Sequence, residues 1–166
     1  ERQTSSRLRR LNGPAGGYAC IGSSQDMSPL CRFLDHLESN GALPRTILFP
    51  LNPTDYEMMA SLTGSFAEDG VRGMIQLGPA WWYNDHYDGI RRQLKATASY
   101  SLLGRFIGMT TDSRSFLSYP RHEYFRRLLC NTLGEEMENG TLPNNPELVG
   151  KMVKNICYSN AVRYFE

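Results

Sequence analysis

The sequence predicts an α/β fold in which parallel strands alternate with helices. Three short apolar runs, of the kind that forms buried strands, follow one another at residues 46–49, 74–77 and 105–110. Segments with apolar residues at helical spacing separate these runs. Strands that alternate with helices favour right-handed crossovers and a parallel sheet. The 166 residues, 40% of them hydrophobic, are the size of about one domain.

Five helices are expected around the three strands. Their apolar residues recur every three or four positions, and Gly, Pro, Ser or Asn stands at most of their ends. Ser28 is expected to cap the first of them. The expected helices cover residues 29–39, 54–66, 88–103, 121–138 and 146–164. Residues 1–27 show little periodicity and are expected to be irregular.

Composition excludes several classes of protein. The 18 Lys and Arg residues nearly balance the 17 Asp and Glu residues, so the chain has no basic excess for nucleic acid or an anionic membrane. No apolar run approaches the ~20 residues of a membrane span. The cysteines form no CxxC or Cys/His cluster, so we expect free thiols and a cytoplasmic protein; they are Cys20, Cys31, Cys130 and Cys157.

Ligand sites of parallel α/β folds gather at the carboxyl ends of the strands. After the third run come Asp112 and Arg114, which face the same way if the backbone is extended. The carboxylate could hold a metal ion or act as a base, and the guanidinium could grip a substrate carboxylate in bidentate fashion. A structural ion pair or a helix cap is the alternative interpretation.

The Trp81-Trp82 pair after the second run also has two interpretations. Large aromatic side chains there pack a core or a barrel mouth, or they present an N–H and a ring face to a sugar. The sequence RHEYFRR at residues 121–127 is typical of a helix start whose charges are solvated and whose Phe125 packs inward.

Three segments resemble the bacterial uronate isomerase (glucuronate isomerase) family. They are GPAWWYND at residues 78–85, FIGMTTDSRSFLSY at 106–119 and RHEYFRR at 121–127, and the closing residues 156–165 resemble the family's terminal helix. The resemblance implies the amidohydrolase superfamily fold, a (β/α)8 TIM-type barrel with a metal at its mouth. On this basis residues 28–166 are the last three βα units and terminal helices of the barrel, and residues 1–27 lie near the active site.

The resemblance also implies an activity and a set of site residues. Members of the family interconvert D-glucuronate with D-fructuronate, and D-galacturonate with D-tagaturonate, in hexuronate catabolism. Asp112 matches the metal-binding aspartate, which is also a candidate for proton transfer. Arg114 and Trp81 match the substrate-binding arginine and the active-site tryptophan, and Arg2 matches a further substrate-contacting arginine. The implied cofactor is a divalent metal ion, with Zn²⁺ as the first candidate.

Part of the family's site has no counterpart in the chain. The His-x-His pair, the catalytic tyrosine and the histidine of the middle strands are absent. We therefore expect an inactive C-terminal fragment of a longer isomerase, with a uronate as substrate. Its open sheet edges would pack against the N-terminal part or in a homo-oligomer.

Two other functions stay open. The same barrel hosts metal-dependent hydrolases, and fold alone does not fix chemistry. The chain could also serve only in assembly. Asp112-x-Arg114 together with Trp81 favours the isomerase, because a hydrolase has no evident need for a carboxylate-binding arginine there.

Overall fold

The computed structural model describes residues 6–12, 26–67, 73–81, 84–113 and 115–166. Strands β1 (Thr46–Leu48) and β2 (Ile75–Leu77) pair in parallel, with Thr46 opposite Ile75 and Leu48 opposite Leu77. These strands confirm the runs predicted at residues 46–49 and 74–77. They form the small sheet of an α/β arrangement that is otherwise rich in helices.

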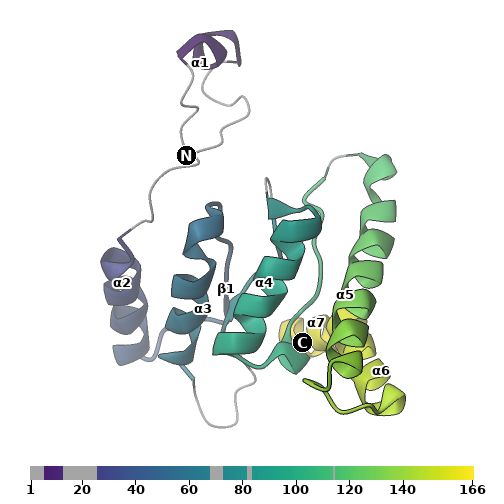
Figure 1. The fold of residues 1–166 in the computed structure, drawn as a ribbon. Coiled ribbons are helices and arrows are strands. Elements are labelled where there is room, and N and C mark those ends of the chain that lie inside the picture. The colour runs from purple at the N-terminus through teal and green to yellow at the C-terminus, as the bar shows by residue number, and fades with distance from the viewer. Residues whose placement is uncertain (1–5, 13–25, 68–72, 82–83, 114) are drawn as a thin grey trace.

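Helices stand side by side in front of this sheet (Figure 1). A short 3-10 turn, η1 (Pro53–Asp55), follows β1 and leads into α3 (Tyr56–Gly64), which packs against β2 and against α4 (Tyr87–Tyr100). Helix α2 (Ser28–Ser39) precedes β1. Its expected cap is wrong in one detail, because Met27 occupies the N-cap position and the Asp26 carboxylate accepts from the Ser28 N–H at 2.9 Å.

The third predicted strand is wrong. Residues 103–105 form a 3-10 turn, η3 (Leu103–Arg105), and residues 106–113 pair with no strand of the described chain. Gly108 has a positive φ of 83°, which interrupts an extended backbone. The Phe106 carbonyl accepts a hydrogen bond from the Asn160 side chain, at 2.9 Å. This stretch, residues 106–113, is called the site segment below.

Helix α5 (Pro120–Glu138) packs beside α4, and the last helices of the chain follow it. This 19-residue helix comes after a 3-10 turn, η4 (Phe116–Ser118). The helix predicted over residues 146–164 is divided into α6 (Pro146–Lys154), a π-helical turn η5 (Asn155–Ser159) and α7 (Asn160–Phe165). Helix α1 (Ser6–Asn12) lies within the segment that was expected to be irregular.

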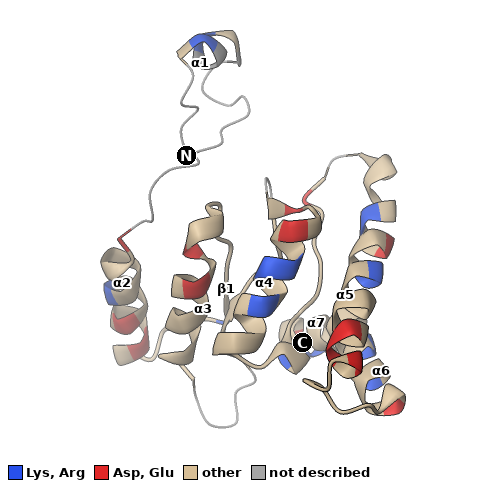
Figure 2. Ribbon diagram, viewed as in Figure 1, with Lys and Arg blue, Asp and Glu red and all other residues tan. Residues whose placement is uncertain are grey.

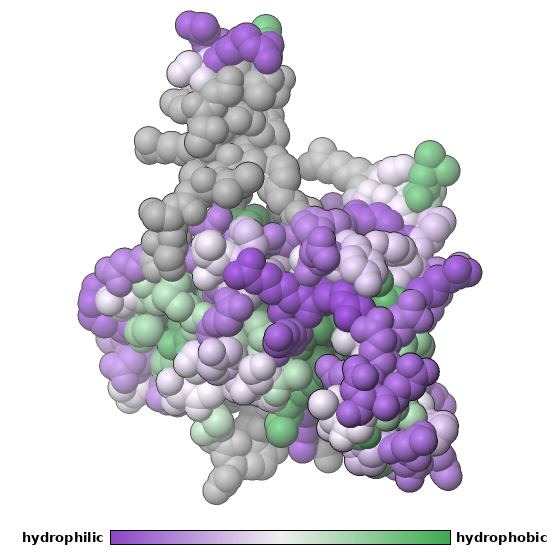
Figure 3. Space-filling model, in the orientation of Figure 1, coloured by the Kyte–Doolittle hydropathy of each residue, from purple (hydrophilic) through white to green (hydrophobic). Residues whose placement is uncertain are grey.

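Three hydrophobic clusters of the described residues hold these elements, the smallest of them around Tyr56 and Leu77. One joins α4, α5, α6 and η5 around Phe106 and Leu129, and another joins α2, α3 and the strands around Leu34 and Ile75. Charges of both signs are spread over α2, α4 and α5 (Figure 2), and apolar side chains show between hydrophilic ones on the same face (Figure 3). No helix in the described ranges is both long enough and apolar enough to cross a membrane.

Candidate functional site

The structure brings two of the predicted site residues together. The Trp81 indole lies beyond the carboxyl end of β2, and its Nε1–H donates to Oδ2 of Asp112 at 2.9 Å. Asp112 lies on the site segment, 31 positions further along the chain. The two loops that follow the second and third apolar runs therefore meet, although the third run does not form a strand.

Asp112 has an unusual backbone. Its φ of 45° makes it the one non-glycine residue with positive φ among those that the structure describes. Aspartate tolerates this left-handed conformation better than most residues, but surrounding contacts must still hold it there. Asp112 is exposed among the described residues.

The ring of Trp81 is also held by an aromatic contact. It meets Phe49, which directly follows β1, edge to face with centroids 5.7 Å apart. Gly78 makes room for this packing, since a Cβ at that position would lie 2.9 Å from the Phe49 ring. The ring contact agrees with the packing interpretation of the tryptophan, and the contact with a sugar stays a prediction.

The loop after β2 is itself anchored. The buried Asn84 donates through Nδ2 to the Leu51 carbonyl at 3.1 Å, which ties this loop to the end of β1. At the start of α4, a Cβ on Gly89 would lie 1.9 Å from the Asn84 carbonyl oxygen, so only glycine fits. The His86 side chain caps the same helix by accepting from the Gly89 N–H.

An ion pair that the sequence analysis missed joins this loop to α5. The Arg121 guanidinium pairs with the Asp85 carboxylate, whose side chain is only 3% exposed, and Nη1–H of Arg121 donates to the Thr111 carbonyl at 3.3 Å. The expectation that the charges of residues 121–127 are solvated holds only in part for Arg121, because its side chain is 38% exposed while its guanidinium pairs with a buried carboxylate. It is confirmed for Arg127, which pairs with Glu123 on the exposed face of the helix. A cation in the first turn of a long helix is the one local signal that could have pointed to Arg121.

Two of the predicted site residues, Arg114 and Arg2, lie outside the described residues. The expectation that Arg114 shares a face with Asp112 assumed an extended backbone, and the φ of 45° at Asp112 contradicts that assumption. The position of Arg114 stays a prediction.

The described residues do not form a metal centre by themselves. No group of three His, Cys, Asp or Glu side chains in these ranges is placed to hold an ion. Asp112 is a single carboxylate, and a stable metal site needs several ligands at once. Any metal at this position needs ligands from elsewhere.

The described geometry defines a class of protein. It is an α/β segment in which a tryptophan that follows a parallel strand meets a carboxylate of the site segment. A family model described as glucuronate isomerase matches residues 1–165, and the chain belongs to that family.

Relatives agree with this assignment. The chain is 53% identical over 165 residues to a uronate isomerase of Bacillus licheniformis and 51% identical over 165 residues to one of Halalkalibacterium halodurans. It covers 35% of the length of each, and 99% of the chain is aligned. A crystal structure of uronate isomerase from Thermotoga maritima matches with a TM-score of 0.83 at 30% identity, over 99% of this chain and 35% of that one. The chain thus spans about a third of the proteins that it matches.

Proposed function

We propose that the chain is the C-terminal part of a uronate isomerase and contributes Trp81 and Asp112 to its active site. The observation that carries this proposal is the hydrogen bond between them, because it joins two of the segments that resemble the family, residues 78–85 and 106–119. Membership of the glucuronate isomerase family supports the reaction class.

The reaction is an aldose–ketose isomerisation. In D-glucuronate or D-galacturonate, a proton leaves C2, beside the aldehyde, and a proton is delivered to C1, so that the carbonyl moves to C2. The intermediate is an enediol, and the products are D-fructuronate and D-tagaturonate. Such a reaction needs a base, polarisation of the carbonyl oxygens and a grip on the distal carboxylate.

The site residues divide these tasks. Asp112 serves as the base or polarises the oxygens, and the Trp81 N–H orients its carboxylate. Arg114 grips the substrate carboxylate, since a guanidinium fork matches a carboxylate in two parallel hydrogen bonds. Arg2 is a further substrate contact in this scheme.

In the whole protein we place these elements in a (β/α)8 barrel. Strands β1 and β2 and the site segment are its last three strand positions, and residues 1–27 lie near its mouth. The rest of the protein supplies the other strands and covers the open edges of the sheet. A divalent metal, Zn²⁺ for preference, would be held by Asp112 together with ligands from outside this chain. We expect a cytoplasmic enzyme that binds neither nucleic acid nor membrane. A homo-oligomer is a second way in which the open edges of the sheet could be covered.

The proposal is tested on the full-length polypeptide that contains this chain. D-Glucuronate and D-galacturonate are supplied in parallel, and the ketose products are followed by proton NMR beside the 166-residue chain alone. We expect turnover by the full-length protein and none by the short chain. A folded full-length protein that converts neither uronate contradicts the proposal and returns the metal-dependent hydrolases and a purely assembling role to consideration.

A further inference from the structure

We propose that Arg121 is a positioning residue that holds Asp112 in place relative to Trp81; this inference rests on the proposed function. Arg121 lies in the first turn of α5 and contacts two segments at once. Its guanidinium pairs with Asp85 in the loop after β2, and the same group donates to the Thr111 carbonyl on the site segment.

These two contacts lie next to the reactive side chains. Asp85 is four residues beyond Trp81, and Thr111 directly precedes Asp112. The guanidinium therefore bridges the two loops that the Trp81–Asp112 hydrogen bond also joins. Because Asp112 has a positive φ, a contact to the preceding carbonyl is well placed to hold that sparsely populated backbone conformation.

The electrostatics indicate that this arrangement is specific. The macrodipole makes the start of a 19-residue helix an unfavourable place for a cation. The Asp85 side chain is almost wholly buried, and burial of a carboxylate is costly unless it is paired. The Asp85 carboxylate offsets the unfavourable position of the Arg121 cation, and the cation offsets the burial of the carboxylate. This explains the ion pair, but it does not explain the further hydrogen bond from Arg121 to Thr111. That bond extends the pair to the site segment, and on this basis we assign Arg121 a role at the site.

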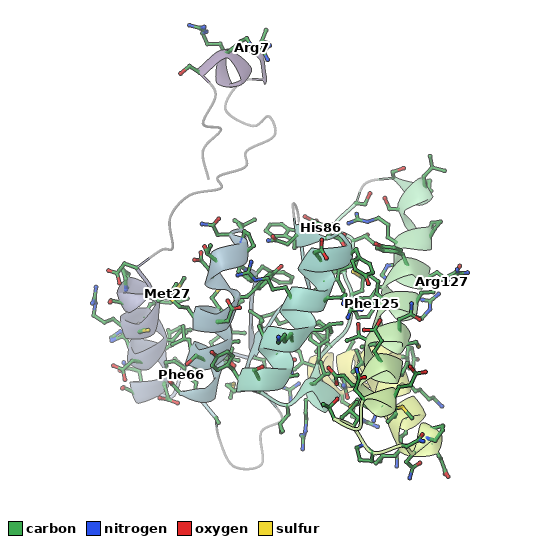
Figure 4. All side chains as sticks on the ribbon, in the orientation of Figure 1. Arg7, Met27, Phe66, His86, Phe125 and Arg127 are labelled. Atoms are coloured by element: carbon green, nitrogen blue, oxygen red, sulfur yellow. The ribbon has the colours of Figure 1, made fainter. Side chains whose placement is uncertain are left out.

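Arg127 on the same helix provides a matched control. It pairs with Glu123 one turn earlier, and both side chains are more than half exposed. In Figure 4 Arg127 points away from α4, whereas Phe125 lies on the side that faces α4. An exposed ion pair of this kind contributes little to stability.

The experiment compares Arg121→Met with Arg127→Met in the full-length protein, with D-glucuronate as substrate. A small misplacement of a reacting group can cost up to about 100-fold in rate, so we expect kcat of Arg121→Met to fall about 10- to 100-fold. KM should change much less, because the substrate-gripping groups remain. Arg127→Met should keep the wild-type kcat and KM.

A second variant guards against loss of folding. Arg121→Met leaves the Asp85 carboxylate buried and unpaired, whereas Asp85→Asn/Arg121→Met removes both charges and still lacks the bond to Thr111. If Arg121→Met unfolds, the double variant is used, and we expect it to fold and to show the same loss in kcat.

A third comparison separates positioning from a merely structural role. In a Trp81→Phe background, removal of Arg121 should cost less in kcat than in the wild type, because both contacts act on Asp112. An equal loss in the two backgrounds, or a folded Arg121 variant with wild-type kcat, overturns the inference. An inactive wild-type protein overturns the proposed function instead, and the inference with it.

Discussion

The Trp81 side chain uses two parts of its indole for two different tasks. The ring packs against Phe49 at the end of β1, with centroids 5.7 Å apart, and the Nε1–H reaches Asp112. Packing fixes where the ring lies, and the hydrogen bond fixes which way the carboxylate points. A phenylalanine at this position would keep most of the packing and lose the donor, so the two tasks can be separated.

We expect Trp81→Phe to reduce activity far more than stability. A hydrogen bond to a charged group contributes about 1.5 kcal/mol at an exposed site, which corresponds to roughly a tenfold loss in kcat/KM. Steady-state kinetics on D-glucuronate and the thermal unfolding midpoint of the full-length protein measure the two effects. Phe49→Leu is the control, since it weakens the packing and keeps the donor. Full activity in Trp81→Phe would show that the indole N–H has no role in turnover.

At the scale of elements, the site segment is held by the C-terminal helices. The Asn160 side chain at the start of α7 donates to both the Gly104 and the Phe106 carbonyl, each at 2.9 Å. Further along, Gly108 lies against the π-helical turn η5, where a Cβ would be 2.4 Å from the Ile156 carbonyl oxygen. These side-chain hydrogen bonds and close contacts hold the site segment, in place of the backbone hydrogen bonds that a neighbouring strand would make.

Gly108→Ala should therefore destabilise the protein. Its positive φ costs a residue with a Cβ about 1–2 kcal/mol, and the added methyl group meets backbone that has little room to move. Gly134→Ala is the matched control, because Gly134 lies inside α5 with nothing within 4 Å of the added Cβ. That change should stabilise the helix by about 0.5–1 kcal/mol. Urea unfolding measures both, and a Gly108→Ala protein at least as stable as the wild type would contradict this account of Gly108.

Elements that depend on local pattern could be predicted, and those that depend on tertiary contacts could not. The alternation of apolar runs and helical spacing located β1, β2 and helices α2 to α5 close to their observed bounds. The prediction of a strand failed at residues 105–110. An apolar run forms a strand only where a neighbouring strand pairs with it, and this run has no such neighbour among the described residues. The local pattern also missed the π-helical turn, since the apolar spacing continues through residues 146–164 without a break.

The candidate site divides in the same way. Trp81 and Asp112 follow strand-like runs, so the rule for parallel sheets predicts both as site residues from the sequence. Asp85 and Arg121 are distant in sequence, and each looks like an ordinary surface charge in its own segment. Their pairing depends on how α5 packs beside α4, which no local pattern specifies.

At the scale of the whole molecule, the last helix of the chain contacts the amino-terminal ends of both strands through Tyr164. The Tyr164 hydroxyl lies 3.2 Å from both the Thr46 and the Met74 carbonyl oxygens, at the start of β1 and just before β2. A second tyrosine, Tyr56, is fully buried beside β2 in the core. Burial raises the pKa of both phenols above the ordinary value of 10.0, most strongly for Tyr56. The free energy of unfolding therefore depends on pH in the alkaline range through both tyrosines.

We expect stability to fall at alkaline pH. Unfolded tyrosines lose their protons near pH 10, while the folded ones still hold theirs, so the unfolded state gains as pH rises above that value. Below about pH 10 the two tyrosines contribute no pH dependence. Urea unfolding midpoints measured from pH 8 to pH 11 give the slope.

Tyr56→Phe isolates the larger contribution. Its hydroxyl has no hydrogen-bond partner among the described residues, so the change should alter stability at pH 8 by less than about 1 kcal/mol. The loss above pH 10 should become shallower. The same alkaline slope in Tyr56→Phe as in the wild type would rule out this tyrosine as a cause.

The most direct test of the proposed site is the turnover of D-glucuronate by the full-length protein and by its Asp112→Asn variant. A base or charged group at the reacting atoms contributes about 100- to 10,000-fold, and asparagine keeps the shape of the side chain without its charge. We predict that the wild type forms D-fructuronate and that Asp112→Asn is at least about 100-fold slower, with an unchanged circular dichroism spectrum and unfolding midpoint. A folded Asp112→Asn protein with the wild-type rate would contradict the account.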